Sequence, residues 1–517
     1  MKNRIIEILL IIILVDVFMV AVSLAPDISI PIPGSDDLKI KIMNYASLTD
    51  FRIKGNSKTA DSLINAYLDD DSTSNGRLYR RSLLDLGPSI KNSFLTNKQK
   101  DGSYALDNFF SALLNQKDSA TVRIEHYGDS QLEGDRITCY VRDYFQEKFG
   151  GSGIGFVPFE DIADNMNLSR ISSPNWIRYT VFHNRYGCGY YGLSGNVYKY
   201  SKYAVVKAKK DTSDTKPGDT TAPKLDVQKI YNNAIVNITL RPTVYYTHAY
   251  LMYGHSQEDC SMNVYNLANN QKLLSETLKP AVGFTMYPLN FSTSVRSFRL
   301  EFSGSVSPDF YGLMIDGTKG VQVDNYGIRG HSGDGLLLIN PEYLATQLKK
   351  LNVKLVIFQY GNNVVPSVKS DKACAQIREM YLNIFKRFKS VAPNISVLVI
   401  GAGDMATKIE GEYTSYPFIP KIKDAQKAAA LEAGCAYWDL FEVMGGSNSI
   451  LTWTKKGLAS HDGHFSAKGQ KIIGKELFNA LMVEYNQYQY RLGKQKKEVA
   501  SPVNKTPVKK KKKGKHK

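Results

Sequence analysis

The stretch that most constrains the fold of this chain is TVRIEHYGDSQLEGDR, residues 121–136. Val122 and Ile124 favour a buried strand, whereas apolar residues recur at helical spacing between residues 137 and 145. Ser130 therefore falls on a turn from a strand to a helix. Such a turn places a hydroxyl beside the free N–H groups of a helix start, where an oxyanion is stabilised. Asp and Ser are also ordinary N-caps, so the turn alone does not show that Ser130 is a nucleophile. That interpretation depends on partner residues elsewhere in the chain.

Strands and helices alternate again in the second half of the chain. Short buried strands are predicted at VQVDNYGI (321–328), VKLVIFQY (353–360), SVLVIG (396–401) and CAYWDL (435–440), and helices at 341–351, 373–391 and 422–433. A further helix is predicted at 106–114, just before the first strand. This alternation predicts an α/β fold with a parallel sheet covered on both faces, whose site lies at the carboxyl ends of its strands.

Residues 177–317 have a different texture. They contain segments rich in Val, Tyr, Thr and Phe with partial alternation, separated by turn residues. This pattern predicts a β-sandwich inserted between the first and second strands of the α/β domain. Its tyrosines are expected in the core or in cross-strand pairs rather than stacked on sugars. Two loops are expected, a glycine-rich one at 149–159 and a flexible one at 209–224.

The amino terminus predicts export. Residues 1–25 hold a long apolar stretch behind Lys2 and Arg4, as in a signal peptide that is removed or a signal anchor that stays. Both place the body of the protein in the periplasm or outside the cell, and an uncleaved segment would anchor it to the inner membrane. Residues 26–95 are polar and irregular, and we interpret them as a spacer.

The formal net charge of +17 is concentrated at the carboxyl terminus, since residues 494–517 contribute 11 Lys against one Glu. These ten charges leave +7 for the rest of the chain. Residues 491–517 are therefore predicted to be a disordered Lys-rich tail that attracts polyanions without specific nucleic-acid binding.

The five cysteines are widely spread, with no CxxC pair and no histidine at zinc spacing. Their odd number leaves at least one free thiol. The sequence therefore predicts neither a metal site nor a cofactor.

Three later stretches supply what a nucleophilic Ser130 needs. DNYGIRGHSG (324–333) follows a predicted strand and offers flexible backbone N–H groups, and GNN (361–363) closes the next strand with side-chain amides. SHDGHFSAKG (460–469) brings an Asp and two His just before the last helix. A serine nucleophile requires a base, a carboxylate that orients the base, and donors for the tetrahedral intermediate.

In this respect the chain resembles the SGNH (GDSL-type) hydrolase family, whose four naming residues match Ser130, Gly330, Asn363 and His464. The resemblance implies that Ser130 is the nucleophile and His464 its base. It also implies an oxyanion hole formed by the N–H groups of Ser130 and Gly330 and by the Asn363 side chain.

The resemblance further implies a flavodoxin-like three-layer domain in two parts, residues 96–176 and 318–490, interrupted by the sandwich. The inserted β-domain and YWDLFEVMGG (437–446) are similar to peptidoglycan O-acetylesterases with a carbohydrate-binding-type insertion. The resemblance thus implies a metal-independent serine esterase that removes O-acetyl groups from peptidoglycan or another polysaccharide. A glycan O-acetyltransferase with the same triad and a non-catalytic glycan-binding protein are the alternatives.

Two positions depart from the family pattern. The family usually has Asp three residues before its catalytic His, where this chain has His461, while Asp462 lies two before His464. Asp462, another acid such as Asp404, or no acid at all could then orient the base. In addition, Val364 follows Asn363 where many members have Asp.

Other polar residues near these motifs have structural interpretations as well. We expect Asp129 to steady the turn and His126 to be packed within its strand. His331 and His461 are candidates for the lining of the cleft, and Asp439 is a candidate cap of the next segment.

Overall fold

The computed structural model of the protein describes residues 28–31, 39–42, 94–116, 121–206, 227–241 and 246–500. The predicted signal segment, most of the spacer, the 209–224 loop and the tail beyond residue 500 lie outside these residues. The chain forms two units, Met1–Ser57 and Lys58–Lys517. In the first unit, β1 (Ile28–Pro31) pairs with β2 (Lys39–Ile42) in antiparallel fashion. All the other described elements belong to the second unit.

A six-stranded sheet forms the centre of the α/β domain. Its order is β18 (Gly320–Gly327), β4 (Thr121–Gly128), β19 (Val353–Gln359), β20 (Ser396–Ile400), β23 (Ala436–Trp438) and β3 (Leu95–Thr96). The first five strands are parallel, and β3 is antiparallel to β23. The second parallel strand of the chain thus lies outside the first. This is the flavodoxin-like order, and the predicted fold class is confirmed.

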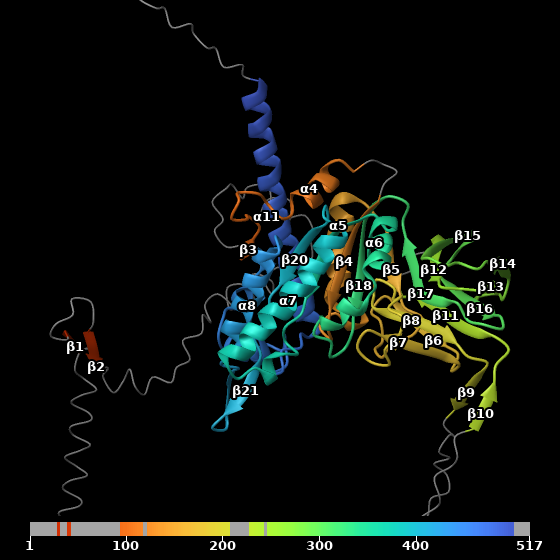
Figure 1. Cartoon of the computed structure of the whole chain (residues 1–517), viewed down its shortest axis with the longest axis horizontal. Coiled ribbons are helices and arrows are strands. Elements are labelled where there is room, and N and C mark those ends of the chain that lie inside the picture. The colour runs from red at the N-terminus through yellow and green to blue at the C-terminus, as the bar shows by residue number, and fades with distance from the viewer. Residues whose placement is uncertain are drawn as a thin grey trace, which may run out of the picture. The chain divides into compact units, whose positions relative to one another are not determined.

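Helices cover both faces of this sheet (Figure 1). Alternate residues of β4 point to opposite faces, so that Val122 and Ile124 join one apolar cluster and Tyr127 joins the other. The first cluster includes α4 (Asp107–Leu114), α5 (Arg136–Phe149) and α11 (Ala467–Ala500); the second includes α6 (Pro341–Lys350), α7 (Asp371–Val391) and α8 (Ile419–Glu432). Burial on both faces explains the nearly continuous apolar character of the strands.

Shorter elements lie in the loops. They are the 3₁₀ turns η2 (Glu133–Asp135), η3 (Asp334–Leu338) and η4 (Val365–Ser367), the helices α9 (Leu440–Met444) and α10 (Ser449–Lys455), and the hairpin of β21 (Ala406–Ile409) and β22 (Glu412–Ser415). Asp439 caps α9, because its side chain accepts the Glu442 N–H. This agrees with its expected capping role.

The long helix α11 corrects the predicted start of the tail. It continues to Ala500, so residues 491–500 are helical rather than disordered. The physical reason is that this stretch still has packing partners. Leu492 packs against the apolar cluster, and Arg491 pairs with Asp107 while its guanidinium lies 3.5 Å from the Tyr104 ring centre. Among the helices that the structure describes, none has both the length and the apolar character needed to cross a membrane.

The inserted domain is a β-sandwich. One sheet has the order β14 (Lys272–Leu278), β13 (Cys260–Asn266), β16 (Ser297–Ser303), β11 (Ala234–Leu240) and β6 (Leu168–Ser172). The other has β15 (Thr285–Val295), β12 (Tyr246–Gly254), β17 (Asp309–Asp316), β8 (Asn196–Tyr200) and β7 (Trp176–Thr180), with β5 (Gly153–Val157) also paired to β17. A separate pair joins β9 (Tyr203–Val206) and β10 (Val227–Ile230). Tyr198 and Tyr253 are buried in the sandwich core, in agreement with the expected packing role of its tyrosines.

The sandwich begins earlier in the chain than residue 177, its predicted start. Three of its strands, β5, β6 and β7, begin before that residue, at 153, 168 and 176. The predicted glycine-rich loop is therefore wrong at its centre, because β5 occupies it. Glycine is needed there for close packing: a Cβ on Gly155 would lie 2.3 Å from Asp324 Oδ1. The glycines thus serve a strand rather than interrupt one.

Buried ion pairs attach the sandwich to the sheet. Arg123 on β4 contacts Asp316 at the end of β17 and Asp324 on β18, the latter at 2.7 Å. Asp324 Oδ1 also accepts the Phe156 N–H of β5 at 2.9 Å. Since a buried guanidinium is stable only when it is paired, this network fixes the position of the sandwich at the β18 edge (Figure 1).

Candidate active site

The candidate site lies at the carboxyl ends of the central strands, as predicted. Ser130 follows β4, Gly330 follows β18, Asn363 follows β19, and His464 lies in the loop before α11. Adjacent parallel strands end at the same edge, so loops distant in sequence meet there.

Ser130, His464 and Asp462 form a continuous chain of hydrogen bonds. Ser130 Oγ lies 2.8 Å from His464 Nε2, and His464 Nδ1 lies 3.0 Å from Asp462 Oδ2. The serine uses one ring nitrogen and the carboxylate the opposite one. This arrangement can remove a proton from the hydroxyl and stabilise the resulting imidazolium.

A tight turn explains why a spacing of two residues is sufficient for Asp462. The Gly463 N–H donates to Ser460 O at 3.0 Å, and Gly463 adopts a φ of +87°. Ser460 Oγ and the His464 N–H both donate to Asp462 Oδ1, which leaves Oδ2 for the imidazole. Partial burial raises the pKa of Asp462, but these bonds and the nearby His464 outweigh it and hold the pKa below its usual value.

Asp404, the alternative acid, has a different role. Its carboxylate is buried and accepts hydrogen bonds from Ser415, Ser449 and the Ile450 N–H. Burial raises its pKa to about 6. Asp404 thus joins the β22 and α10 segments, and both of its oxygens are already occupied.

Candidate donors for an oxyanion lie on the loops that follow β4, β18 and β19. Within the described part of the chain, neither the Ser130 N–H nor the Gly330 N–H has a protein acceptor. The exposed Asn363 amide donates to Asp129 Oδ2 at 2.9 Å and to His331 O at 3.2 Å. Asn363 can therefore serve an oxyanion by exchanging the longer of these bonds.

Two residues that support the turn lie beside it. The Asp129 carboxylate accepts the Gln131 N–H at 2.9 Å and also holds Asn363, which agrees with its expected steadying role. Burial raises the pKa of Asp129 to about 6. Gln131, which the sequence did not single out, donates to Gly463 O at 2.7 Å. Gln131 thus connects the serine turn to the histidine loop.

The other histidines are held structurally. His126 is buried between Gln359 Oε1 and Thr138 Oγ1, each at 3.1 Å, and burial lowers its pKa to about 3. His331 is buried as well, accepts the Gly335 N–H, and has a pKa lowered to about 4 by burial. His461 stacks on Tyr413 at 3.8 Å between ring centres.

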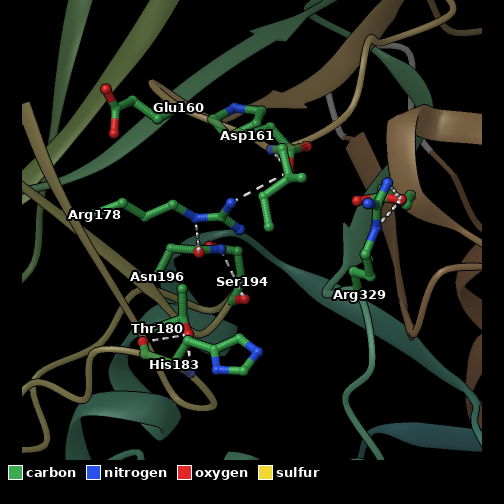
Figure 2. A network of polar contacts seen from close by, with 12 residues as sticks. Glu160, Asp161, Arg178, Thr180, His183, Ser194, Asn196 and Arg329 are labelled. Carbon is green, nitrogen blue, oxygen red and sulfur yellow. Dashed lines mark hydrogen bonds and ion pairs between the residues drawn. The ribbon is translucent and has the colours of Figure 1, made fainter. Parts of the chain in front are cut away.

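The sandwich contributes one side of the site. The Phe182 ring lies over Gly330, since a Cβ there would approach the ring to 3.2 Å, and it also contacts His331. Figure 2 shows the neighbouring polar network, in which Arg178 extends between Asp161 and Asn196. Across from it, Arg329 pairs with Glu133 at 2.7 Å. The inserted domain brings Phe182 and Arg178 to the site without a motif in the sequence, whereas Arg329 and Glu133 lie in the stretches 324–333 and 121–136 of the α/β domain.

The chain was compared with known proteins. Residues 304–472 match the family model described as GDSL-like Lipase/Acylhydrolase family, a range that includes Gly330, Asn363 and His464 but not Ser130. A comparison with curated protein sequences gives no match. Among solved structures, "Peptidoglycan O-acetylesterase in action, 5 min" is 19% identical and has a TM-score of 0.57 over 76% of this chain and 99% of its own. That similarity shows a shared fold.

Two further solved structures match shorter parts of the chain. The acetyl xylan esterase AlAXEase is 16% identical over 31% of this chain and 81% of its own, with a TM-score of 0.25. A family 29 carbohydrate binding module is 10% identical over 33% and 89%, with a TM-score of 0.20. The family match includes three of the residues at the sheet edge, and this chain therefore carries a domain that matches the GDSL-like Lipase/Acylhydrolase family model.

Proposed function

We propose that this protein is an exported serine esterase that removes O-acetyl groups from a cell-wall or extracellular glycan. The observation that carries the proposal is the 2.8 Å contact between Ser130 Oγ and His464 Nε2, on a turn where the Ser130 N–H has no acceptor among the described residues. Asp462 on the opposite ring nitrogen completes the triad. Asp462 lies two residues before His464 rather than three, but this departure from the family pattern does not separate the acid from the base.

The geometry supports a two-step acyl transfer. His464 takes the Ser130 proton through Nε2 as the oxygen attacks the acetyl carbonyl, and Asp462 keeps the Nδ1 proton in place. The N–H groups of Ser130 and Gly330 and the amide of Asn363 stabilise the oxyanion. His464 then returns the proton to the departing sugar oxygen. In the second step His464 activates water, which releases acetate and restores the serine.

A small cavity adjoins the serine turn. The cavity lined by Asp129, Gln131, Gln359 and Asn362, among others, has a volume of about 10 Å³, which is room for about one water molecule. The Asn363 side of the site is exposed, so a polymer can approach from solvent. This exposure favours a polymeric substrate, and the name of the peptidoglycan O-acetylesterase with the same fold suggests acetylated peptidoglycan as the first substrate to test.

Export rests on the apolar residues 1–25, which lie outside the described part of the chain. In this proposal they carry the protein to the periplasm or beyond and, if uncleaved, anchor it to the inner membrane. Contact of the Lys-rich tail with polyanions also stays a prediction.

The test compares the wild type with Ser130→Ala and with Ser169→Ala, an exposed serine of the sandwich, on an activated acetyl ester and on acetylated peptidoglycan. We expect Ser130→Ala to lower kcat at least about 10³-fold, because the nucleophile is lost. Ser169→Ala should leave kcat unchanged. Equal turnover by the wild type and Ser130→Ala would refute catalysis by Ser130.

The same reaction with an acceptor glycan separates an esterase from a transferase. Free acetate is the expected product. An acetylated acceptor formed in place of acetate would assign the transferase activity, and acetate from other acetylated polysaccharides but not from peptidoglycan would change the substrate.

A further inference from the structure

Three potential metal ligands converge on the sandwich, apart from the serine site. They are Cys188 in the loop between β7 and β8, His255 directly after β12, and Asp309 at the start of β17. One ligand atom from each residue lies within 4.8 Å of the other two. They are 67 and 54 residues apart in sequence, since their numbers are 188, 255 and 309, so only the folded sandwich brings them together.

Asp309 has one oxygen that lacks a donor. Its side chain is fully buried, and Oδ1 accepts hydrogen bonds from Tyr186 Oη at 2.8 Å and Lys199 Nζ at 3.0 Å. Oδ2 has no hydrogen-bond partner among the described residues, and His255 Nδ1 lies 3.5 Å from it. A buried carboxylate oxygen without a donor is costly. One oxygen held by donors while the other faces the cluster is the arrangement expected of a single-oxygen metal ligand.

His255 is fixed in orientation. Its ring packs on Tyr190 with 4.0 Å between ring centres, and its backbone adopts a φ of +48°, which is uncommon for a residue with a side chain. Tyr190 is itself packed edge-on against Tyr343 of α6. The imidazole nitrogen that faces Asp309 is thus held by its surroundings, as a metal ligand requires.

The arrangement of the cluster differs from that of the Ser130–His464–Asp462 triad. In the serine site the imidazole contacts Ser130 and Asp462 through opposite ring nitrogens. In the sandwich, a single ring nitrogen lies within 4.8 Å of both the Cys188 sulfur and the Asp309 carboxylate. Donor atoms that converge on one point suit a cation, whereas a triad uses both ring nitrogens, one to take the serine proton and the other to bind the carboxylate.

We propose that Cys188, His255 and Asp309 form a binding site for a divalent cation of the zinc class. Thiolate, imidazole and carboxylate are the donors that Zn²⁺ takes, at about 2.0–2.3 Å. Two such ligands in tetrahedral geometry lie about 3.4 Å apart, close to the 3.5 Å between His255 Nδ1 and Asp309 Oδ2. Cys188 is exposed, so a fourth position remains open to water.

Such an ion would hold a loop that reaches the candidate active site. The segment from Phe182 to Cys188 connects the ring over Gly330 with the proposed ligand. Tyr186, halfway along it, donates to Asp309. The site would therefore stabilise the sandwich side of the cleft and take no part in the acyl transfer.

Cobalt provides the first test, because tetrahedral thiolate ligation gives a near-ultraviolet charge-transfer band. The untagged full chain, stripped with a chelator, is titrated with Co²⁺ and then with Zn²⁺. We expect the band to saturate at one equivalent and to vanish when Zn²⁺ displaces Co²⁺, which usually binds more weakly. Cys188→Ser and His255→Ala should abolish or weaken the band, while His183→Ala, an exposed histidine of the same loop, should retain it.

Thiol alkylation provides an independent readout. Cys188 is exposed and the other four cysteines are buried, so a folded chain presents one reactive thiol. Zn²⁺ should slow its alkylation at least about tenfold in the wild type and not in His255→Ala, because a coordinated thiolate is protected. Circular dichroism checks the fold of each variant. Cys188 and His255 are not buried, so their variants test the site even if Asp309→Asn does not fold.

Absence of the band, or a band that His255→Ala leaves unchanged, would overturn the proposal. Alkylation that proceeds equally with and without Zn²⁺ would also overturn it. None of these outcomes depends on ester hydrolysis, so the failure of either proposal is distinguishable from the failure of the other.

Discussion

The two domains each hold a histidine beside an aspartate, and the two pairs have opposite surroundings. In the α/β domain, His464 Nδ1 lies 3.0 Å from Asp462 Oδ2, and 64% of the Asp462 side chain is exposed. In the sandwich, His255 Nδ1 lies 3.5 Å from Asp309 Oδ2, and the Asp309 side chain is fully buried. The nearby nucleophilic atom is a serine oxygen in the first case and a cysteine sulfur in the second.

The difference shows that the residue types alone do not determine what such a cluster does. Asp462 directs its free oxygen to an imidazole whose other nitrogen contacts Ser130, so the ring can take the serine proton at Nε2 while Asp462 stabilises the resulting imidazolium. Asp309 directs its free oxygen to the point where a sulfur and a nitrogen already converge. The first geometry suits acyl transfer and the second suits a cation.

The largest expected effect tests the role of Asp462. Asp462→Asn should lower kcat about 10³-fold, because an amide can no longer stabilise the imidazolium or fix its tautomer. Its free energy of unfolding should change by less than about 0.5 kcal/mol, because the side chain is mostly exposed. Steady-state kinetics and urea denaturation measure the two quantities.

Asp404→Asn serves as the matched control for that experiment. Asp404 accepts hydrogen bonds from Ser415, Ser449 and the Ile450 N–H in the interior. Asp404→Asn should therefore lower the free energy of unfolding, and it should change kcat much less than Asp462→Asn does. If Asp404→Asn instead lowers kcat 10³-fold at unchanged stability and Asp462→Asn does not, the assignment of the acid is reversed.

A smaller effect tests what burial does to a carboxylate beside the triad. The pKa of Asp129 is raised to about 6 by burial, against about 3.9 in an unfolded chain. Between these values the folded state binds more protons, so the Asp129 contribution to the free energy of unfolding falls by about 2.3 kcal/mol as pH rises from 4 to 7. This pH-dependent loss of stability is absent in Asp129→Asn, because the amide does not titrate. The stability of the variant relative to the wild type should therefore increase by that amount over the same pH range.

Urea denaturation at pH 4 and pH 7 measures this change. Other titrating groups cancel in the comparison of variant with wild type, and the cost of replacing an acceptor that holds Gln131 and Asn363 is constant with pH. A stability difference that does not change with pH would contradict the raised pKa.

The smallest effect concerns the stability contributed by Asp309 in the sandwich, measured in the presence of a chelator. Asp309→Asn should lower the free energy of unfolding by about 2 kcal/mol, because buried Asp309 accepts bonds from Tyr186 and Lys199 and the variant loses the ion pair. Asp462→Asn, measured side by side, should not. Equal stability of both variants in thermal and urea denaturation would mean that burial does not distinguish the two carboxylates.

Much of the fold follows from local pattern. Apolar runs predict the parallel strands, and helical spacing predicts α6, α7 and α8, because these signals depend on neighbours within one element. Ser130, His464, Gly330 and Asn363 are recognisable because each lies in a short motif beside a strand end or a helix start. The loop predicted around Gly155 is wrong because the requirement for glycine at this position comes from Asp324, which lies on a distant strand.

What the sequence by itself determined is the order of elements, the α/β class with its inserted sandwich, and the four motifs at the sheet edge. Only the tertiary structure decided that Asp462 rather than Asp404 contacts His464, and that Cys188, His255 and Asp309 meet. The reason is physical. Periodicity and turn chemistry act over a few residues, whereas the direction of a carboxylate oxygen depends on burial and on donors that arrive from other segments of the folded chain.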